Sequence, residues 1–222
     1  MNGGCEGMTM ANNERESRDE RQDRVFEMVC GVILAFLAAL LAITDLMGGR
    51  FADDQSYAES EKTSAFSWYQ AKSIKQSLAE GQADTLRALL AAGTVRADQV
   101  GAVSTVLTEL DQKVARYNKE KNEILEGSDK VGRENWAQDV SGEMGKVIGA
   151  NEWQAKERAL GKVGDIFDMA TLFLQLSLVM GAIAIVFQHA FARRLFFFSM
   201  CLLGIVGIVI SAVAANQGFG VG

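Results

Sequence analysis

A charge-free apolar run from Val29 to Thr44 reads VCGVILAFLAALLAIT and continues through Asp45 to Met47. At roughly 1.5 Å of rise per residue, a helix over this run nearly covers a hydrocarbon core of about 30 Å. A cleaved signal peptide is the alternative, but its apolar region is shorter and no A-x-A-like cleavage site follows in ITDLMGGRFA. We therefore predict a first transmembrane helix over residues 28–47.

Two further apolar runs cover residues 169–191 and 195–215, and only the short segment 192–194 separates them. This arrangement predicts two transmembrane helices joined by a tight hairpin turn. The chain is 49% hydrophobic and 23% charged, and its long charge-free runs alternate with charge-dense ones. That distribution is typical of a membrane protein. The expected fold class is an all-α membrane protein with three transmembrane helices.

Basic residues near the spans predict the orientation, because Lys and Arg are retained on the cytoplasmic side. Arg193 and Arg194 fill the expected turn at 192–194, and basic residues also precede the first span: Arg15, Arg18, Arg21 and Arg24. The tail 1–27 and the turn are therefore expected in the cytoplasm. Segments 48–168 and 216–222 are then expected on the external side.

The external segment is expected to be helical, because the chain has no proline and little β-branched alternation. A break at Gly48 and Gly49 should precede a helix from about Asp53 to Ala92. A second helix should start near residues 94–98 and reach Glu126. Its apolar positions step by three and four, which predicts a heptad seam packed along the first helix in a coiled-coil-like hairpin: Val100, Val103, Leu107, Leu110, Val114, Tyr117 and Ile124.

The glycine-rich stretch 127–149 predicts a connector with at most one short helix. Asn151, with Gln154 three residues on, resembles a capping box at the start of a long helix. We expect this helix to begin outside and to continue into the second span.

Candidate chemistry is sparse along the chain, and we expect no catalytic residue, metal site or cofactor. His189 is the single histidine, and no phosphate-binding, dinucleotide or metalloprotease motif is present. The net charge is −6 without a basic stripe, so nucleic acid is not an expected partner. Asp45 is the one ionisable side chain well within a span, which gives little support to transport.

Small residues recur at helical spacing in all three spans and predict close helix packing, within one chain or between chains. The positions chosen for this role are Gly31, Ala35, Gly181, Gly204, Gly207 and Ser211.

The stretch SAFSWYQAKSIKQSL, residues 64–78, places three aromatic residues on different sides of one helix. Trp68 shares a face with Ile74 and Leu78, which suits the neighbouring heptad helix. Phe66 and Tyr69, with Ser73 at their edge, point elsewhere, because each residue advances a helix by about 100°. We predict that these three contact a different polypeptide. The alternative is that a third helix of the same domain, carrying Trp153, covers them.

The sequence WYQAKSIKQ at 68–76, FDMATLFLQLSLVMGAIAI at 167–185 and the basic hairpin resemble a bacterial membrane-protein family known as domain of unknown function 4337. The resemblance is weak over residues 81–149. It implies the three-span layout and a place in the bacterial inner membrane, and it brings no catalytic residue.

We expect a non-enzymatic structural or accessory protein in the lipid bilayer. Its external helical domain would mediate assembly, either as a homo-oligomer or as a subunit of a larger membrane complex. The alternative is a sensor or channel-type component gated through that domain.

Overall fold

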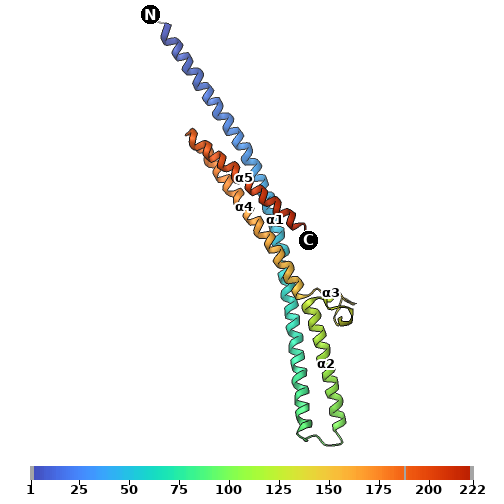
Figure 1. Cartoon of the computed structure of the whole chain (residues 1–222). Coiled ribbons are helices and arrows are strands. Elements are labelled where there is room, and N and C mark those ends of the chain that lie inside the picture. The colour runs from blue at the N-terminus through green and yellow to red at the C-terminus, as the bar shows by residue number, and fades with distance from the viewer. Residues whose placement is uncertain (1–2, 188, 221–222) are drawn as a thin grey trace. The chain divides into compact units, whose positions relative to one another are not determined.

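The computed structural model describes residues 3–187 and 189–220, with side chains at residue 21, at 24–187 and at 189–220. The elements, in chain order, are α1 (Gly3–Ala91), α2 (Val100–Glu126), α3 (Ser128–Val131), a 3₁₀ turn (Arg133–Asn135), β1 (Asp139–Val140), β2 (Glu143–Met144), α4 (Ala150–Val186) and α5 (Ala190–Gly218) (Figure 1). These elements form two compact units. We call them the apolar unit, built from residues up to Ala52 and from Gly161 onward, and the polar unit, Asp53–Leu160.

Three helices, α1, α4 and α5, are long and apolar enough to cross a membrane. The predicted all-helical chain with three candidate spans is therefore confirmed at the level of length and composition. The side chains of Arg15 and Arg18, expected on the cytoplasmic side, lie outside the described side chains.

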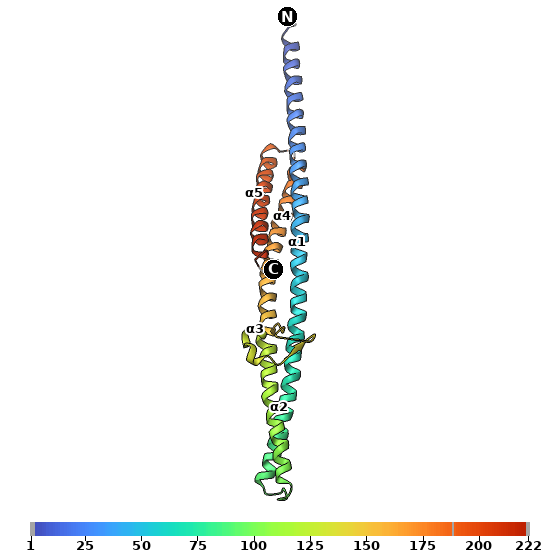
Figure 2. The same ribbon diagram turned by 90° about the vertical axis from the view of Figure 1, so that its right-hand side faces the viewer.

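Helices α1 and α5 run parallel in the apolar unit (Figure 2). Their side-chain contacts recur at intervals of seven residues on both helices. Leu37 lies against Gly204, and a Cβ added at Gly204 would come within 2.9 Å of the leucine Cδ2. Seven residues on, the hydroxyls of Thr44 and Ser211 are hydrogen-bonded at 3.1 Å. Phe51 lies against Gly218 after a further seven residues. Large side chains on α1 thus meet small ones on α5, which lets the two backbones approach closely.

Helix α4 runs antiparallel to α1 and α5, and it also packs closely through small residues. Gly181 leaves room for Leu34 and Met200, because an added Cβ would lie 2.5 Å from an atom of each. Ser177 is buried and donates a 2.7 Å hydrogen bond to the carbonyl oxygen of Met200, so its hydroxyl is satisfied within the unit.

Several helix boundaries in this unit differ from the sequence prediction. Gly48 and Gly49 do not break α1, which continues through them to Ala91. A glycine inside a helix costs only about 1 kcal/mol, and Gly48 gains a close contact with Phe167, whose Cβ lies 3.2 Å from an added Cβ.

α4 ends at Val186 and α5 begins at Ala190, so the predicted turn at 192–194 is wrong. Arg193 and Arg194 belong to the first turns of α5, where the Arg193 amide donates to the His189 carbonyl at 2.9 Å. Alanine and arginine are good helix formers, so Ala-Arg-Arg extends α5 rather than interrupting it. At its other end α5 continues to Gly218, past the expected end of the span at 215, and residues 221–222 of the predicted tail lie outside the described part.

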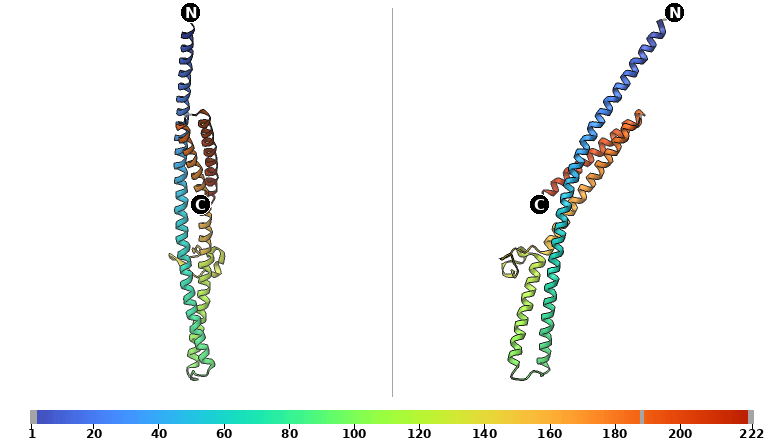
Figure 3. Two further views of the ribbon diagram at one scale, coloured as in Figure 1. Left: turned by 90° about the vertical axis from the view of Figure 1, so that its left-hand side faces the viewer. Right: turned by 180° about the vertical axis from the view of Figure 1, so that it is seen from behind.

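In the polar unit the C-terminal part of α1 and α2 run side by side and antiparallel (Figure 3). α1 ends at Ala91, and Gly93 has a φ of 65°, a left-handed conformation that favours glycine. The end near Gly93 and the end of α2 at Glu126 are confirmed, whereas α2 starts slightly later than predicted, at Val100. The core between these helices joins small residues on α1 to larger ones on α2: Ala79, Ala83 and Leu86 pack with Leu107, Leu110 and Val114.

The connector 127–149 contains α3, the 3₁₀ turn and a β1–β2 ribbon that the glycine pattern did not predict. Ser141 and Gly142 both have positive φ, as the two-residue turn of a tight hairpin requires. The predicted capping box at Asn151 is wrong, because Asn151 lies within α4 and donates to Glu126 at 2.7 Å. Glu152 provides the cap instead, since its carboxylate accepts the Gly149 amide at 3.2 Å.

Candidate functional site in the polar unit

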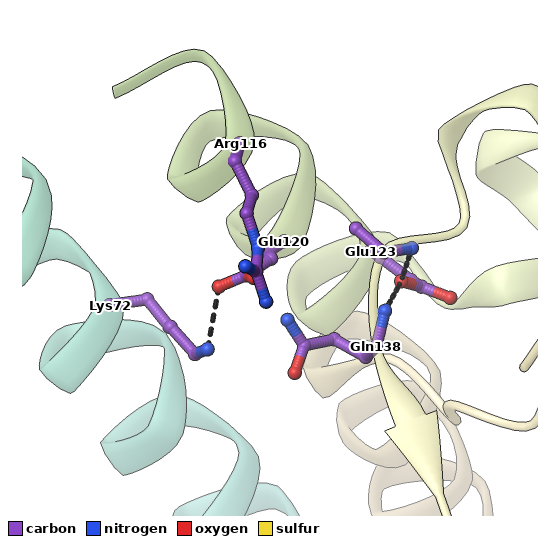
Figure 4. Close-up of polar contacts among 6 residues, drawn as sticks. Lys72, Arg116, Glu120, Glu123 and Gln138 are labelled. Atoms are coloured by element: carbon purple, nitrogen blue, oxygen red, sulfur yellow. Dashed lines mark hydrogen bonds and ion pairs between the residues drawn. The ribbon is translucent and has the colours of Figure 1, made fainter. Parts of the chain in front are cut away.

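A buried carboxylate, Glu123, holds the connector against α2. Its side chain is 0% exposed. One carboxylate oxygen accepts the Ser128 hydroxyl at 2.7 Å. The other accepts the backbone amides of Ala137 at 2.7 Å and Gln138 at 2.8 Å (Figure 4). Ser128 in turn accepts the Val147 amide at 3.0 Å. One charge on α2 therefore anchors both halves of the connector.

A second buried carboxylate, Glu120, lies one turn earlier on α2 and is 1% exposed. Lys72 of α1 donates to it at 2.5 Å, and Arg116 of α2 donates to its other oxygen at 2.7 Å (Figure 4). Burial raises the pKa of Glu120, but the hydrogen bonds and positive charges of Lys72 and Arg116 outweigh burial and lower that pKa overall. Glu120 is thus held ionised and joins α1 to α2.

Gln138 brings the connector next to this ion cluster. Its side chain is buried, and its amide nitrogen has no hydrogen-bond partner among the described residues. Figure 4 shows that nitrogen on the side of Arg116 and Glu120. The connector therefore places a hydrogen-bond donor that is unsatisfied among the described residues beside Glu120 and Arg116. The Glu120 cluster is the one that joins α1 to α2.

An open cavity of about 270 Å³ lies where α1, α4 and the connector meet in the polar unit. Trp68 and Trp153 provide aromatic walls, while Glu61 and Lys146 supply one charge of each sign. Trp153 is further fixed by an edge contact with Tyr57, at 5.9 Å between ring centroids. The cavity therefore combines aromatic walls with a few polar groups, as ligand-binding cavities commonly do.

Among the described residues, no group of three or more His, Cys, Asp or Glu side chains is placed to hold a metal ion.

The face of α1 that packs on α2 is not the one the sequence predicted. Tyr69 lies under the Lys121 ammonium of α2, 5.3 Å from its ring centroid. Ile74 and Leu78, expected in the seam, are each 62% exposed. Small and polar residues on α1 let α2 approach closely, and this outweighs the burial of the larger apolar residues. Phe66, Tyr69 and Ser73 are all half-buried within the chain, and their contact with another polypeptide stays a prediction.

The predicted packing residues divide into two groups. Gly181, Gly204, Gly207 and Ser211 lie in contacts between helices of the apolar unit. Gly31 and Ala35 are exposed, and a Cβ added at Gly31 would meet nothing within 4 Å. Any packing role of these two is therefore between chains.

Sequence reasoning missed Glu120, Glu123 and Gln138. The available signal was the gap in the heptad seam between Tyr117 and Ile124, where Lys121 stands at the position expected to be apolar. Glu120 and Glu123 are three residues apart and lie on that same side of α2, so the gap marks a polar layer within the seam.

Residues 26–217 match the family model described as domain of unknown function 4337 (DUF4337). The chain belongs to this family. The match spans both units of this DUF4337 protein, including the residues 81–149 where the sequence resemblance is weak. No match was found among curated proteins or solved structures.

The lowered pKa of Glu120 predicts a pH dependence of stability. A carboxyl whose pKa is lower in the folded than in the unfolded state stabilises the fold above its unfolded pKa, about 4.5, and this contribution is lost as the pH falls through the folded pKa. The difference in unfolding free energy between the wild type and Glu120→Gln should therefore shrink as the pH falls below about 4.5. Denaturant titrations of both proteins from pH 7 to pH 3 measure it. A difference that stays constant over this range would contradict the assignment.

Proposed function

We propose that this DUF4337 protein is a non-enzymatic, membrane-anchored assembly protein whose polar unit attaches it to further copies or to a larger membrane complex. The observation that carries the proposal is the exposure of Ile74 and Leu78, at 62% each, on one face of α1 in the polar unit. Large exposed apolar side chains on a regular surface are typical of contact sites.

The surroundings of Ile74 and Leu78 support this interpretation. Positions at helical spacing on the same face are all exposed and none carries a charge: Ser60, Thr63, Ser67, Ala71, Gly81 and Thr85. Charged residues flank this face rather than occupy it: Lys75 lies four residues after Ala71 and three before Leu78, and Glu59 lies four residues before Thr63. Charged residues are depleted at the centres of protein interfaces, so a long charge-free face suits a protein partner.

Membrane anchoring through α1, α4 and α5, with the N-terminus in the cytoplasm of a bacterial inner membrane and the polar unit outside, is part of the proposal. It is supported by the basic residues at one end of the apolar unit, where the Arg193 guanidinium lies 4.5 Å from the ring centroid of Phe26. Phe26 also contacts Phe197 at 5.4 Å. The start of the first candidate span and the basic start of α5 therefore share the end that the charge rule assigns to the cytoplasm.

This orientation predicts opposite labelling of two introduced cysteines, in a background without the native ones. Ser141→Cys, in the exposed ribbon turn, should react with a membrane-impermeant maleimide on intact cells, and Ala190→Cys, at the exposed start of α5, should react only after lysis. The reverse pattern would exclude the proposed orientation.

The second candidate function, a sensor or channel-type component, is favoured by a different observation. Asp45 and Asp168 line one cavity of about 240 Å³ in the apolar unit, together with Thr171. Ionisable groups in spans often serve an ion pathway. Ion flux through reconstituted protein that Asp45→Asn abolishes would favour this second function over assembly.

The assembly proposal predicts that Ile74→Lys with Leu78→Lys separates the complex extracted in mild detergent. Two ammonium groups in a desolvated contact should weaken it by at least 10-fold, because truncating or charging interface anchors costs about 2 kcal/mol or more. The mass of the purified complex is the measurement. Ser104→Lys with Thr108→Lys, an exposed pair at the same spacing on α2, is the matched control. A complex of unchanged mass in the Ile74/Leu78 variant would reject this face.

A further inference from the structure

One face of α4 in the apolar unit contains a polar residue that the rest of the unit leaves uncovered. The residues Leu172, Gln175, Val179, Ala182 and Val186 follow one another by three and four positions, and all are exposed. Leu172 and Val179 are each 53% exposed. No charged residue occurs between Met169 and Val186. Gln175 is therefore an exposed carboxamide within an apolar helix face.

Gln175 differs from Ser177, another polar side chain of this segment. Ser177 is buried and bonded to the Met200 carbonyl at 2.7 Å, whereas Gln175 faces away from the unit and makes no hydrogen bond to the described residues. An uncompensated polar group in hydrocarbon costs several kcal/mol. If α4 crosses the bilayer, something outside this chain must satisfy the carboxamide.

We propose that the α4 face around Gln175 packs against the same face of a second copy, with the two Gln175 carboxamides hydrogen-bonded to each other. This inference rests on the proposed membrane anchoring and names the partner and the contact. When all copies insert in the same orientation, two of them can be related by a two-fold axis normal to the membrane. Each residue of one copy near that axis then lies opposite the same residue of the other copy. A carboxamide both donates and accepts, so two identical ones at one depth satisfy each other.

The rest of the face fits a second copy of the same helix. Ala182 lies seven residues after Gln175, and small residues at such spacing let two helices approach closely in lipid. An apolar groove of about 330 Å³ beside Val179 and Ala182 can accept side chains of the facing helix. Because the face carries no charge between Leu172 and Val186, identical faces do not repel each other. A lipid acyl chain could fill the groove, but it has no group that bonds Gln175.

The first test measures association of two differently labelled copies by energy transfer in lipid vesicles. Gln175→Leu keeps the surface apolar and should weaken association about 3- to 30-fold, the range for one hydrogen-bonded contact between membrane helices. Gln175→Asn, which retains the carboxamide, should weaken it less. Gln217→Leu, at an exposed glutamine near the end of α5, should leave association unchanged. Equal association of Gln175→Leu and wild type would overturn the proposal.

The second test locates the contact in native membranes by cysteine cross-linking, in a background without the native cysteines. Val179→Cys should form a disulfide-linked homodimer on oxidation, whereas Leu202→Cys, 65% exposed on α5, should not. The proposal that a second copy covers this face would be overturned by either of two results. Val179→Cys could cross-link to a different polypeptide, or it could cross-link no more than Leu202→Cys does. Carbonate extraction is done first: a chain released from the membrane contradicts the proposed anchoring, whereas a retained chain that fails to cross-link contradicts only this contact.

Discussion

Replacing Glu123 with alanine is expected to lower the unfolding free energy of the polar unit by at least about 3 kcal/mol, because each lost hydrogen bond to a buried carboxylate leaves a donor unsatisfied at a cost of about 1–3 kcal/mol. The change removes three of them, from the Ser128 hydroxyl and from the amides of Ala137 and Gln138. Those amides belong to the connector. The loss should therefore be concentrated in residues 127–149.

Hydrogen exchange gives the local measurement for this prediction. The Ala137 and Gln138 amides should lose protection in Glu123→Ala, while amides in the middle of α2 should change less. Glu109→Ala is the matched control, because Glu109 is exposed on the same helix and takes part in no such network. Unchanged protection at Ala137 and Gln138 would mean that the connector is held by something other than Glu123.

The sequence predicted the helices of this protein well and their contacting faces less well. The three apolar runs could be read directly, because spanning a bilayer requires length and low charge, which are visible in one chain. The ends at Gly93 and Glu126 could also be predicted, since glycine marks helix ends locally. The continuity of α1 through Gly48 and Gly49 could not, because it depends on a contact with Phe167, which is far away in the sequence.

The faces of α1 show why packing partners are harder to infer. Hydrophobicity favoured Ile74 and Leu78 as the buried side, yet α2 packs on Ala79, Ala83 and the Lys72 side. Two helices choose faces by shape and by complementary polar groups as well as by apolar area. Glu120 supplies the complementary group, and its partner on α1 is 48 residues away. No local pattern connects such positions.

Lys72→Met is expected to lower the unfolding free energy of the polar unit by about 2 to 4 kcal/mol, because removal of one partner leaves a buried charge poorly compensated. Lys72 donates to Glu120 from α1 at 2.5 Å, and its side chain is 17% exposed. Arg116 remains bonded to Glu120, but 72% of its side chain is exposed, so solvent screens its charge and limits the compensation. Lys75→Met, at an exposed lysine three residues on, should have an effect below about 0.5 kcal/mol.

The double variant Lys72→Met with Glu120→Met separates the ion pair from other effects of losing Lys72. Replacing both members of a buried pair by apolar residues of similar size is often neutral or stabilising, so the double variant should be more stable than Lys72→Met alone. Denaturant unfolding of the two single variants and the double one gives the coupling energy between the positions. If the loss of unfolding free energy in the double variant equals the sum of the losses in the two single variants, Lys72 does not act through Glu120. It would then act through its packing over Tyr117, where the ammonium lies 6.0 Å from the ring centroid. A large coupling energy would instead show that the ion pair of Lys72 and Glu120 determines which face of α1 packs on α2. The exposure of Ile74 and Leu78 would then follow from this ion pair.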